Sequence, residues 1–405
     1  MIRPISLFLL IGIIVANREA TPAVHPNLFL LLLLLVIAPA LSIVVARLAK
    51  KTNLFTLLAT FAVLLSWIIA VYFLSWAALV RSVTQNVFFV GDIIVVLPAI
   101  FWLLVLWFVT SPISNRLSWV SHRLRLDILL LLIPLFFLLA ASNITALCGV
   151  QEEYVEIVEL LAFLILLALA PFFITKTLSA KPMNNYELSS SIADIGRSAG
   201  VRQSKILVWD THNRIMNALA VGVIFQPKTV VLTDKLIANL TPQELRAVAA
   251  HEFGHHKYWH IPFLILTTVS VLVWSNKLLQ AMRFDMGGFF VFALQLLLMV
   301  FAIIILSRFF ERQADAYAAV ALSKASGNDC VTLDGANSLG SALGAIAQAQ
   351  HIHTDRNDPF HGSIASRQQN LHDLVGCSFS AIPINAKVFW IKIIICVSLI
   401  LGLFA

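Results

Sequence analysis

Charged residues are scarce in this sequence. Asp, Glu, Lys and Arg together make up only 12% of its 405 residues, whereas 60% are hydrophobic. This balance lies far outside the range of soluble globular domains. It indicates a chain that exposes much of its surface to lipid.

Cysteine is also rare, and its few positions are unrelated to one another. There are four cysteines, with no C-x-x-C pair among them: Cys148, Cys330, Cys377 and Cys396. A disulfide framework and a thiolate metal site are therefore not expected, and a reducing cytoplasmic environment fits.

No basic run interleaved with aromatic residues occurs in a polar segment, although the formal net charge is +7. We therefore do not expect nucleic acid as a partner. No internal repeat or low-complexity linker stands out either. The excess of Lys and Arg is better explained by membrane topology.

Long apolar runs recur along the chain. A bilayer crossing takes about 20 helical residues, and eight runs approach or exceed that length. They are Leu28–Ala46, Leu54–Val80, Ile93–Val109, Ile128–Leu147, Val155–Thr175, Ile261–Met282, Gly288–Leu306 and Val388–Phe404. A shorter run, Ile5–Ala16, fits a signal sequence, a short span or a re-entrant piece. The pattern predicts a polytopic α-helical membrane protein with about seven to nine spans.

The basic loops predict an orientation. Three clusters of Lys and Arg fall on one side if every run spans: near residues 47–51, near residues 116–125 and after the fifth run at Lys176 and Lys181. The positive-inside rule makes that side cytoplasmic. The acidic residues Glu152, Glu153 and Glu156 fall on the opposite side, which agrees.

The five residues His251-Glu252-Phe253-Gly254-His255 carry the clearest chemical signal. Two histidines four positions apart on a helix lie on the same face, about 40° out of register. Both imidazoles can then bind one Zn²⁺, and the glutamate can serve as the general base of a hydrolase. We expect one zinc per chain, with His251 and His255 as ligands and Glu252 as the base.

A hydrolytic zinc site usually takes a third protein ligand, and Glu311 is the best candidate. The two apolar runs between His255 and Glu311 predict a transmembrane hairpin, which returns the chain to the metal helix. Asp315 lies one turn beyond Glu311 and is expected to hold a ligand imidazole through its free N–H.

The polar stretches between the runs predict a mixed α+β unit. We expect a helix near Asn185–Ala199, strands at Lys205–Val208, Ile215–Val223 and Thr229–Leu232, a helix opening at Thr241 and, after a helix at Arg308, a loop continuing to Gln368. The predicted division is an N-terminal membrane bundle (1–175), a first part of a zinc-peptidase domain (176–260), a transmembrane hairpin (261–307), a second part of that domain (308–387) and a C-terminal span (388–405).

These residues resemble the M48-type integral-membrane zinc metalloproteases, which group the Ste24 CAAX prenyl proteases with the HtpX heat-shock proteases. The resemblance covers about residues 176–371. It is carried by Asn217-Ala218-Leu219-Ala220, Val230–Asp234, the His251 motif, Ser307-Arg308 with Glu311 and Asp315, and the pair His361 and Arg367. Gly362 stands where the family has proline, so a different turn is expected there.

The resemblance implies a gluzincin-like zinc-peptidase domain and further site residues. His361 or Arg367 is implied as the second oxyanion donor besides zinc. The segment Ile215–Val223 is interpreted as an edge strand, on which Asn217, Ala218 and Ala220 would bind a peptide as an added strand. His256, His260, His351 and His353 are expected to have no role in the site.

The expected function is a zinc metallo-endopeptidase acting at the cytoplasmic face of a bacterial inner membrane or an ER-type membrane. Its partners would be the lipid bilayer and a peptide or protein substrate. Two substrate hypotheses stay open: Ste24-like C-terminal (CAAX-type) processing of prenylated proteins, and HtpX-like cleavage of misfolded membrane proteins. A signalling protease of the sensor type is less favoured, because no external loop is long enough for a sensor domain. Five long spans before the catalytic region favour Ste24, but the C-terminal span fits neither group.

Overall fold

The computed structural model describes residues 27–404, except 49–52, 85–89, 112–115, 199, 202–203, 223–227 and 282–287. The segment Ile5–Ala16 lies outside the described residues. The chain divides into two compact units, Met1–Leu169 and Ala170–Ala405. Each unit has its own hydrophobic core.

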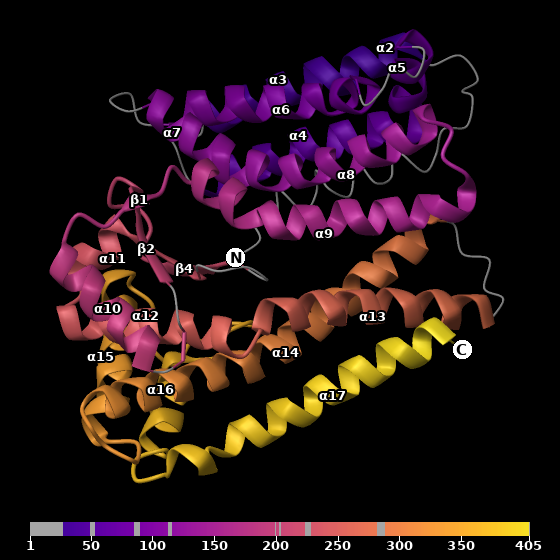
Figure 1. The fold of residues 1–405 in the computed structure, drawn as a ribbon. Coiled ribbons are helices and arrows are strands. Elements are labelled where there is room, and N and C mark those ends of the chain that lie inside the picture. The colour runs from indigo at the N-terminus through magenta and orange to yellow at the C-terminus, as the bar shows by residue number, and fades with distance from the viewer. Residues whose placement is uncertain are drawn as a thin grey trace. The chain divides into compact units, whose positions relative to one another are not determined.

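The described part of the first unit is helical, and its helices are coloured indigo to magenta in Figure 1. The elements are α2 (Leu28–Leu32), η1 (Leu33–Ile37), α3 (Ala38–Leu48), α4 (Asn53–Phe73), α5 (Trp76–Thr84), α6 (Val90–Thr110), α7 (Arg116–Arg123), η3 (Leu124–Leu129), α8 (Leu130–Leu147) and α9 (Glu152–Thr177), which continues into the second unit. Trp67 and Leu103 are fully buried in its core. The indole Nε1 of Trp67 donates to the carbonyl of Val95 at 2.8 Å, so its polar atom is satisfied in the apolar interior.

Seven helices among the described residues are long and apolar enough to cross a membrane, and an eighth is added if one bent pair counts as a span. This confirms the predicted helical polytopic architecture. The bent pair is α4 and α5, which differ in direction by 63°. The run Leu54–Val80, expected as one span, is therefore a broken helix. The chain turns between them at Ser75, which has a φ of 55°.

The second unit contains a four-stranded sheet in the order β1-β2-β4-β3. The strands are β1 (Lys181–Pro182), β2 (Ser204–Trp209), β3 (Ala218–Val221) and β4 (Lys228–Thr233). β4 is buried along its whole length and pairs with β2 in parallel and with β3 antiparallel. The sequence predicts β2, β3 and β4 but misses β1, because two residues carry no periodic pattern.

Helices surround this sheet and continue beyond it. They are α10 (Tyr186–Ser198), α11 (Asp234–Asn239), α12 (Pro242–Lys257), α13 (His260–Ala281), α14 (Gly288–Ala325), α15 (Leu333–Ala349), α16 (Ile364–His372), η4 (Phe379–Ala381) and α17 (Pro383–Phe404). The prediction of a loop continuing to Gln368 is wrong, because α15 and α16 occupy much of that segment. Glycine and serine weaken the helix signal of α15, but packing against α12 and α14 supplies the stability that propensity does not.

Helix α12 starts where the sequence predicts. Thr241 is its N-cap, Pro242 follows, and Thr241 and Glu244 form a reciprocal capping box. A capped start fixes which residues of α12 face inward. His251 lies deep in this helix rather than at a frayed end.

Helix α14 is a single helix of 38 residues, in which the second arm of the predicted hairpin continues directly into the segment carrying Glu311. It lies beside α12 (Figure 1). The residues between α13 and α14, where the hairpin turns, lie outside the described part of the chain.

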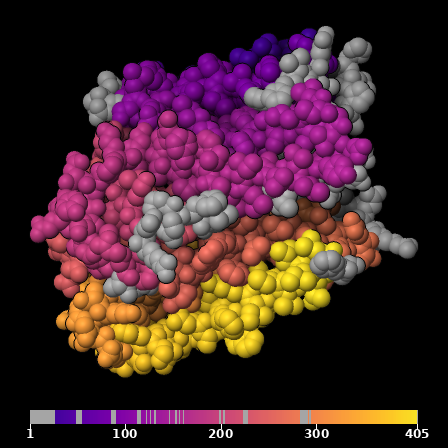
Figure 2. Space-filling model, in the orientation of Figure 1, coloured from indigo at the N-terminus to yellow at the C-terminus, as the bar shows by residue number. Residues whose placement is uncertain are grey.

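Helix α17, yellow in Figures 1 and 2, lies along the surface of the second unit and packs against α13 and α14. It exposes large apolar side chains, including Phe389, Trp390, Ile394 and Leu401. Such a face fits contact with lipid.

The close approach of α12 and α14 depends on Gly254. A Cβ placed there would lie 2.9 Å from the Cα of Ala314. We expect Gly254→Ala to push the helices apart, lowering stability by about 1–3 kcal/mol and weakening the binding of the zinc ion that the sequence predicts. Gly340→Ala is the matched control, since its Cβ would meet only Gln368, at 3.8 Å. Thermal unfolding and zinc content of both variants in detergent would check this, and equal behaviour of the two would contradict it.

Candidate metal centre and active site

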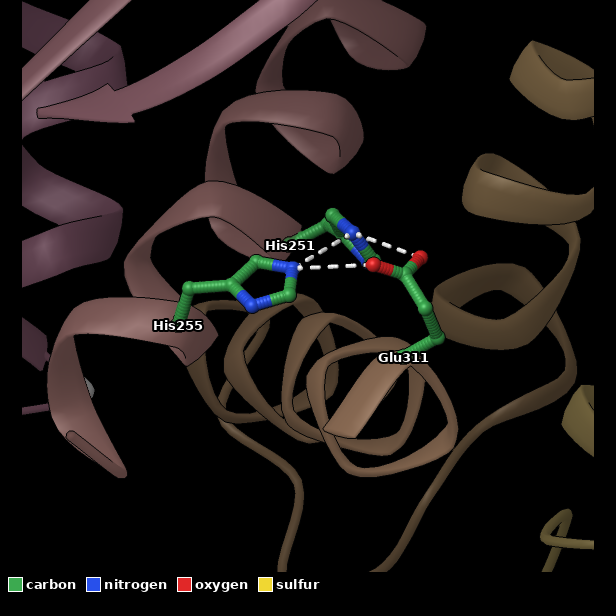
Figure 3. A group of neighbouring side chains, drawn as sticks. All are labelled: His251, His255 and Glu311. Atoms are coloured by element: carbon green, nitrogen blue, oxygen red, sulfur yellow. Dashed lines mark hydrogen bonds and ion pairs between the residues drawn. The ribbon is translucent and has the colours of Figure 1, made fainter. Parts of the chain in front are cut away.

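Three side chains of the second unit converge on one point. Helix α12 presents His251 and His255, and α14 presents Glu311 opposite them (Figure 3). Nε2 of His251 and Nε2 of His255 are 3.1 Å apart, and each lies 3.5 Å from an oxygen of the Glu311 carboxylate. Ligand atoms of these three residues all lie within 4.8 Å of one another. Two imidazoles and one carboxylate at this spacing form a donor set suited to zinc.

The surroundings of these atoms also fit a cation. Oε2 of Glu311 is buried and accepts no hydrogen bond from the described residues. Burial and the neighbouring His251 lower the pKa of His255 well below its ordinary value, so His255 is neutral, which is the form that binds a metal. Burial also lowers the pKa of His251, but Asp315 and Glu311 outweigh it and raise that pKa. The same negative charge attracts a divalent cation to His251.

Asp315 fixes the outer side of His251. Its Oδ1 lies 2.9 Å from Nδ1 of His251, one turn of α14 beyond Glu311. Arg367, from α16, donates to both oxygens of Asp315, at 2.8 Å from Nε and 2.6 Å from Nη2. Nη2 of Arg367 also lies 3.4 Å from Oε2 of Glu311. The guanidinium therefore pairs with both carboxylates, balances one of their two negative charges and is largely committed to them.

Glu252 lies on α12 between the two histidines but is not part of the three-residue ligand group. Burial raises the pKa of its carboxyl group, and the negative charge of Glu311 adds to the effect, against the opposing influence of His251. Its carboxylate accepts a hydrogen bond from the backbone N–H of Ala220, on β3. A carboxyl group with a raised pKa is suited to exchanging protons near neutral pH.

Strand β3 is an edge strand of the sheet among the described residues. The N–H of Thr233 donates to the carbonyl of Asn217 at 3.1 Å, so these two residues form a hydrogen-bonded pair. In an antiparallel ladder, hydrogen-bonded residue pairs alternate with pairs that are not hydrogen-bonded to each other. Ala218 and Ala220, opposite Leu232 and Val230, therefore point their backbone groups away from β4.

The backbone contact of Ala220 with Glu252 agrees with that register. The outward-facing backbone groups of β3 therefore lie beside the predicted general base, and one of them, the N–H of Ala220, donates to it. Asn217 is placed differently. Both its N–H and its carbonyl are tied to Thr233, so its backbone is not free for a peptide.

His361 lies in the loop before α16, with Nε2 3.9 Å from Oε1 of Glu311. Its Nδ1 lies 2.9 Å from Oδ1 of Asp358, which also accepts the N–H groups of Phe360 and His361. Burial raises the pKa of Asp358, but these hydrogen bonds outweigh it and lower that pKa. Gly362 closes the turn with a φ of 78°, which proline cannot adopt, so the local turn differs from a proline turn as expected.

Arg308 holds the loop that carries His361. Its guanidinium donates to the carbonyl of Pro359 at 2.9 Å and to Oδ1 of Asn357 at 3.2 Å. If His361 acts on a substrate as the family resemblance implies, we expect Arg308→Ala to leave zinc content unchanged but to lower kcat about 10-fold, because His361 is no longer held in place. Arg312→Ala is the control, since Arg312 contacts Asn370 of α16 instead. Zinc content and initial rates would check this, and an Arg308→Ala rate equal to that of the control would contradict it.

The sequence interpretation misses one contact of the metal centre. Nδ1 of His260, at the start of α13, lies 2.9 Å from Nδ1 of His255. Nε2 of His256 contacts the carbonyl of Thr229, and His256 is not in the ligand group, so its lack of a role stays a prediction. For His260, the expectation of no role missed this contact with His255. Periodicity and spacing gave no signal, because a turn of the chain separates α12 from α13.

These features define a class: a polytopic helical protein with a His-Glu-x-x-His metallopeptidase-type site. Residues 182–338 match the profile of Peptidase family M48. The chain therefore carries an M48 peptidase domain, which confirms the resemblance drawn from the motifs.

Curated relatives match over part of their length. CAAX prenyl protease 1 of Saccharomyces cerevisiae is 32% identical over 116 residues, 28% of this chain and 25% of that protein. The Protease HtpX homolog of Archaeoglobus fulgidus is 25% identical over 187 residues, 44% of this chain and 53% of the relative. The chain thus aligns with about a quarter to a half of these relatives. The crystal structure of S. mikatae Ste24p resembles this fold over 90% of this chain and 98% of that one, with a TM-score of 0.51 and 18% identity.

Proposed function

We propose that this chain is a membrane-embedded zinc metallo-endopeptidase. The observation that carries the proposal is the convergence of His251, His255 and Glu311 from two helices, in a chain with seven or eight candidate spans. These residues would hold one zinc per chain. When bound, zinc supplies Lewis-acid activation of a water molecule and of the scissile carbonyl.

Glu252 acts as the general base and then as the general acid in this proposal. It takes a proton from the attacking water and delivers it to the leaving amine. Its raised pKa and its place between the two histidines support this role. The hydrogen bond from Ala220 fixes one carboxylate oxygen and leaves the other free to take the proton.

The substrate peptide binds as an added strand along β3. Ala218 and the carbonyl of Ala220 offer it outward-facing backbone groups, while the N–H of Ala220 stays on Glu252, and the methyl side chains of both residues leave room for the peptide. Asn217, just before β3, holds that strand against β4 through its hydrogen bonds with Thr233, so its backbone does not bind the peptide. The peptide is then placed next to Glu252.

The developing oxyanion is stabilised by His361 rather than by Arg367. Nε2 of His361 faces Glu311 from an exposed loop, and Asp358 engages the opposite ring nitrogen. Because Nδ1 donates to Asp358, donation from Nε2 to an oxyanion requires a proton on each ring nitrogen. Arg367 is buried and bound to Asp315, so its role is to position that carboxylate.

For the substrate we propose C-terminal, CAAX-type processing at the cytoplasmic membrane face. The support is that five predicted spans precede the catalytic region and that the basic loops predict a cytoplasmic position for it. The likeness to S. mikatae Ste24p concerns the fold alone. HtpX-like cleavage of misfolded membrane proteins is the alternative, and the likeness to relatives named Protease HtpX homolog supports it.

Cleavage of one C-terminal peptide, with and without a farnesyl group, tests both proposals. The enzyme is the full chain purified in detergent, and Glu252→Ala is the blank. Cleavage that needs both the lipid and Glu252 supports a prenyl-protein protease. Cleavage indifferent to the lipid but dependent on Glu252 supports a broad quality-control endopeptidase. No Glu252-dependent cleavage by zinc-loaded protein would overturn the CAAX-type proposal.

A further inference from the structure

The two candidate metal ligands on α12 have different outer partners. His251 contacts the carboxylate of Asp315, whereas Nδ1 of His255 lies 2.9 Å from a second imidazole, that of His260. His260 is 1% exposed, and its ring stacks on Phe310 with centroids 4.3 Å apart and planes 5° from parallel. Its ring is therefore held in one orientation beside the ligand.

Hydrogen bonds continue from His260 to the C-terminal span. Nε2 of His260 lies 2.9 Å from Oε1 of Gln313, which is itself 2% exposed. Nε2 of Gln313 then donates to Oδ1 of Asn385 at 2.9 Å. Gln313 lies on α14, two residues after Glu311, and Asn385 lies in the first turn of α17. Three helices are thus joined behind one ligand.

Metal ligation fixes the direction of every proton in this chain of contacts. If His255 binds zinc through Nε2, its neutral ring carries the proton on Nδ1 and must donate there. His260 must then accept at Nδ1 and donate from Nε2 to the amide oxygen of Gln313. The amide nitrogen of Gln313 donates onward to Asn385. No donor faces a donor, and each buried polar atom in the series has a partner.

A second contact ties α17 to the metal helix. Nζ of Lys392 donates to the backbone carbonyl of Tyr258, the C-cap residue of α12. The ammonium group also lies 4.8 Å from the ring centroid of Phe263 and 5.5 Å from that of Phe310. A cation at a helix C-terminus is favourable, and Phe310 is the ring on which His260 stacks.

We propose that His260, Gln313 and Asn385 form a positioning relay that holds His255 in the tautomer and orientation needed to bind zinc, so that the C-terminal span α17 sets the metal affinity of the site. The proposal rests on the zinc site proposed above. It gives α17 a role beyond anchoring in lipid. None of the three relay residues touches the reacting atoms.

Zinc dissociation from the full-length, detergent-purified protein tests the relay. Release is followed with a chromogenic chelator, together with thermal unfolding of the metal-depleted protein. His260→Phe keeps the stacked ring but can neither accept nor donate. We expect it to weaken zinc binding about 10–100-fold, the range for loss of an outer-shell partner, whereas the metal-depleted form should lose only the stability expected from leaving Oε1 of Gln313 without its donor. Gln313→Met and Asn385→Leu should also weaken zinc binding, by smaller factors.

Two further variants separate the relay from general packing. Gln313→Glu keeps an acceptor for His260, and the amide of Asn385 can turn to donate to it, so zinc retention should be restored relative to Gln313→Met. Ser398→Ala removes the 3.0 Å contact between Ser398 and Ser270, which joins α17 to α13 away from the relay. It should leave zinc release unchanged.

If the His260→Phe variant releases zinc at the same rate as the wild-type protein, the relay is overturned while the proposed function stands. Equal losses in Ser398→Ala and Asn385→Leu would also overturn it, because packing of α17 would then explain both. A wild-type protein that binds no zinc would overturn the proposed function, and the relay with it.

Discussion

Glu252→Gln is expected to lower kcat for peptide cleavage by about 10²–10⁴-fold, the usual contribution of general acid–base catalysis, while zinc stays bound. Glutamine keeps the shape of the side chain and still has an oxygen to accept the N–H of Ala220. It cannot take a proton from water. Since Glu252 is not in the ligand group, His251, His255 and Glu311 remain unchanged.

Zinc stoichiometry and single-turnover rates of the purified protein check this expectation. Lys257→Gln is the control, because it removes an exposed charge from the same helix. A Glu252→Gln protein that has lost its zinc would show that Glu252 supports the site structurally. An unchanged rate with zinc bound would remove Glu252 from the proposed mechanism.

The core of the site could be predicted from the sequence because helical geometry is local. Positions four apart on one helix share a face, which was enough to bring His251 and His255 together. Glu311 is far away in the sequence, but two apolar runs in succession predict a hairpin that returns the chain to its starting side. The same spacing argument placed Asp315 one turn beyond Glu311, and the structure has it 2.9 Å from His251.

The contacts that the sequence could not supply depend on packing between distant segments. His260 follows a turn at Trp259, which has a φ of 58°, and no periodic pattern gives the angle between α12 and α13. The contact of Asn385 with Gln313 needs the position of α17 against α14, which hydropathy leaves open. Glycine and serine hid α15 for a similar reason, since its stability comes from neighbouring helices.

The role of Arg367 also depends on neighbours that the sequence does not reveal. The family pattern suggested an oxyanion donor, but the pattern contains no information on which carboxylates surround it. In the structure both Asp315 and Glu311 lie within ion-pair distance of the guanidinium, and its side chain is only 10% exposed. We therefore propose that Arg367 offsets negative charge on Asp315 and Glu311 rather than binding the oxyanion.

Arg367→Met is expected to make the stability of the protein depend strongly on zinc. Removing one partner of a buried ion pair costs about 3–5 kcal/mol, because the remaining charge is left uncompensated. Here Asp315 and Glu311 would both lose their cation. A bound divalent ion replaces part of that charge, so the zinc-loaded variant should lose less stability than the metal-depleted one.

Thermal unfolding of both forms, with and without zinc, measures this difference. Arg312→Met is the control on α14: Arg312 is exposed and contacts only the side chain of Asn370 among the hydrogen bonds described, so about 0–1 kcal/mol is expected. The double variant Arg367→Met with Asp315→Asn should recover part of the loss, because it removes the uncompensated charge as well. If zinc loading leaves the destabilisation by Arg367→Met unchanged, the guanidinium does not balance the ligand carboxylates, and its contribution is packing alone.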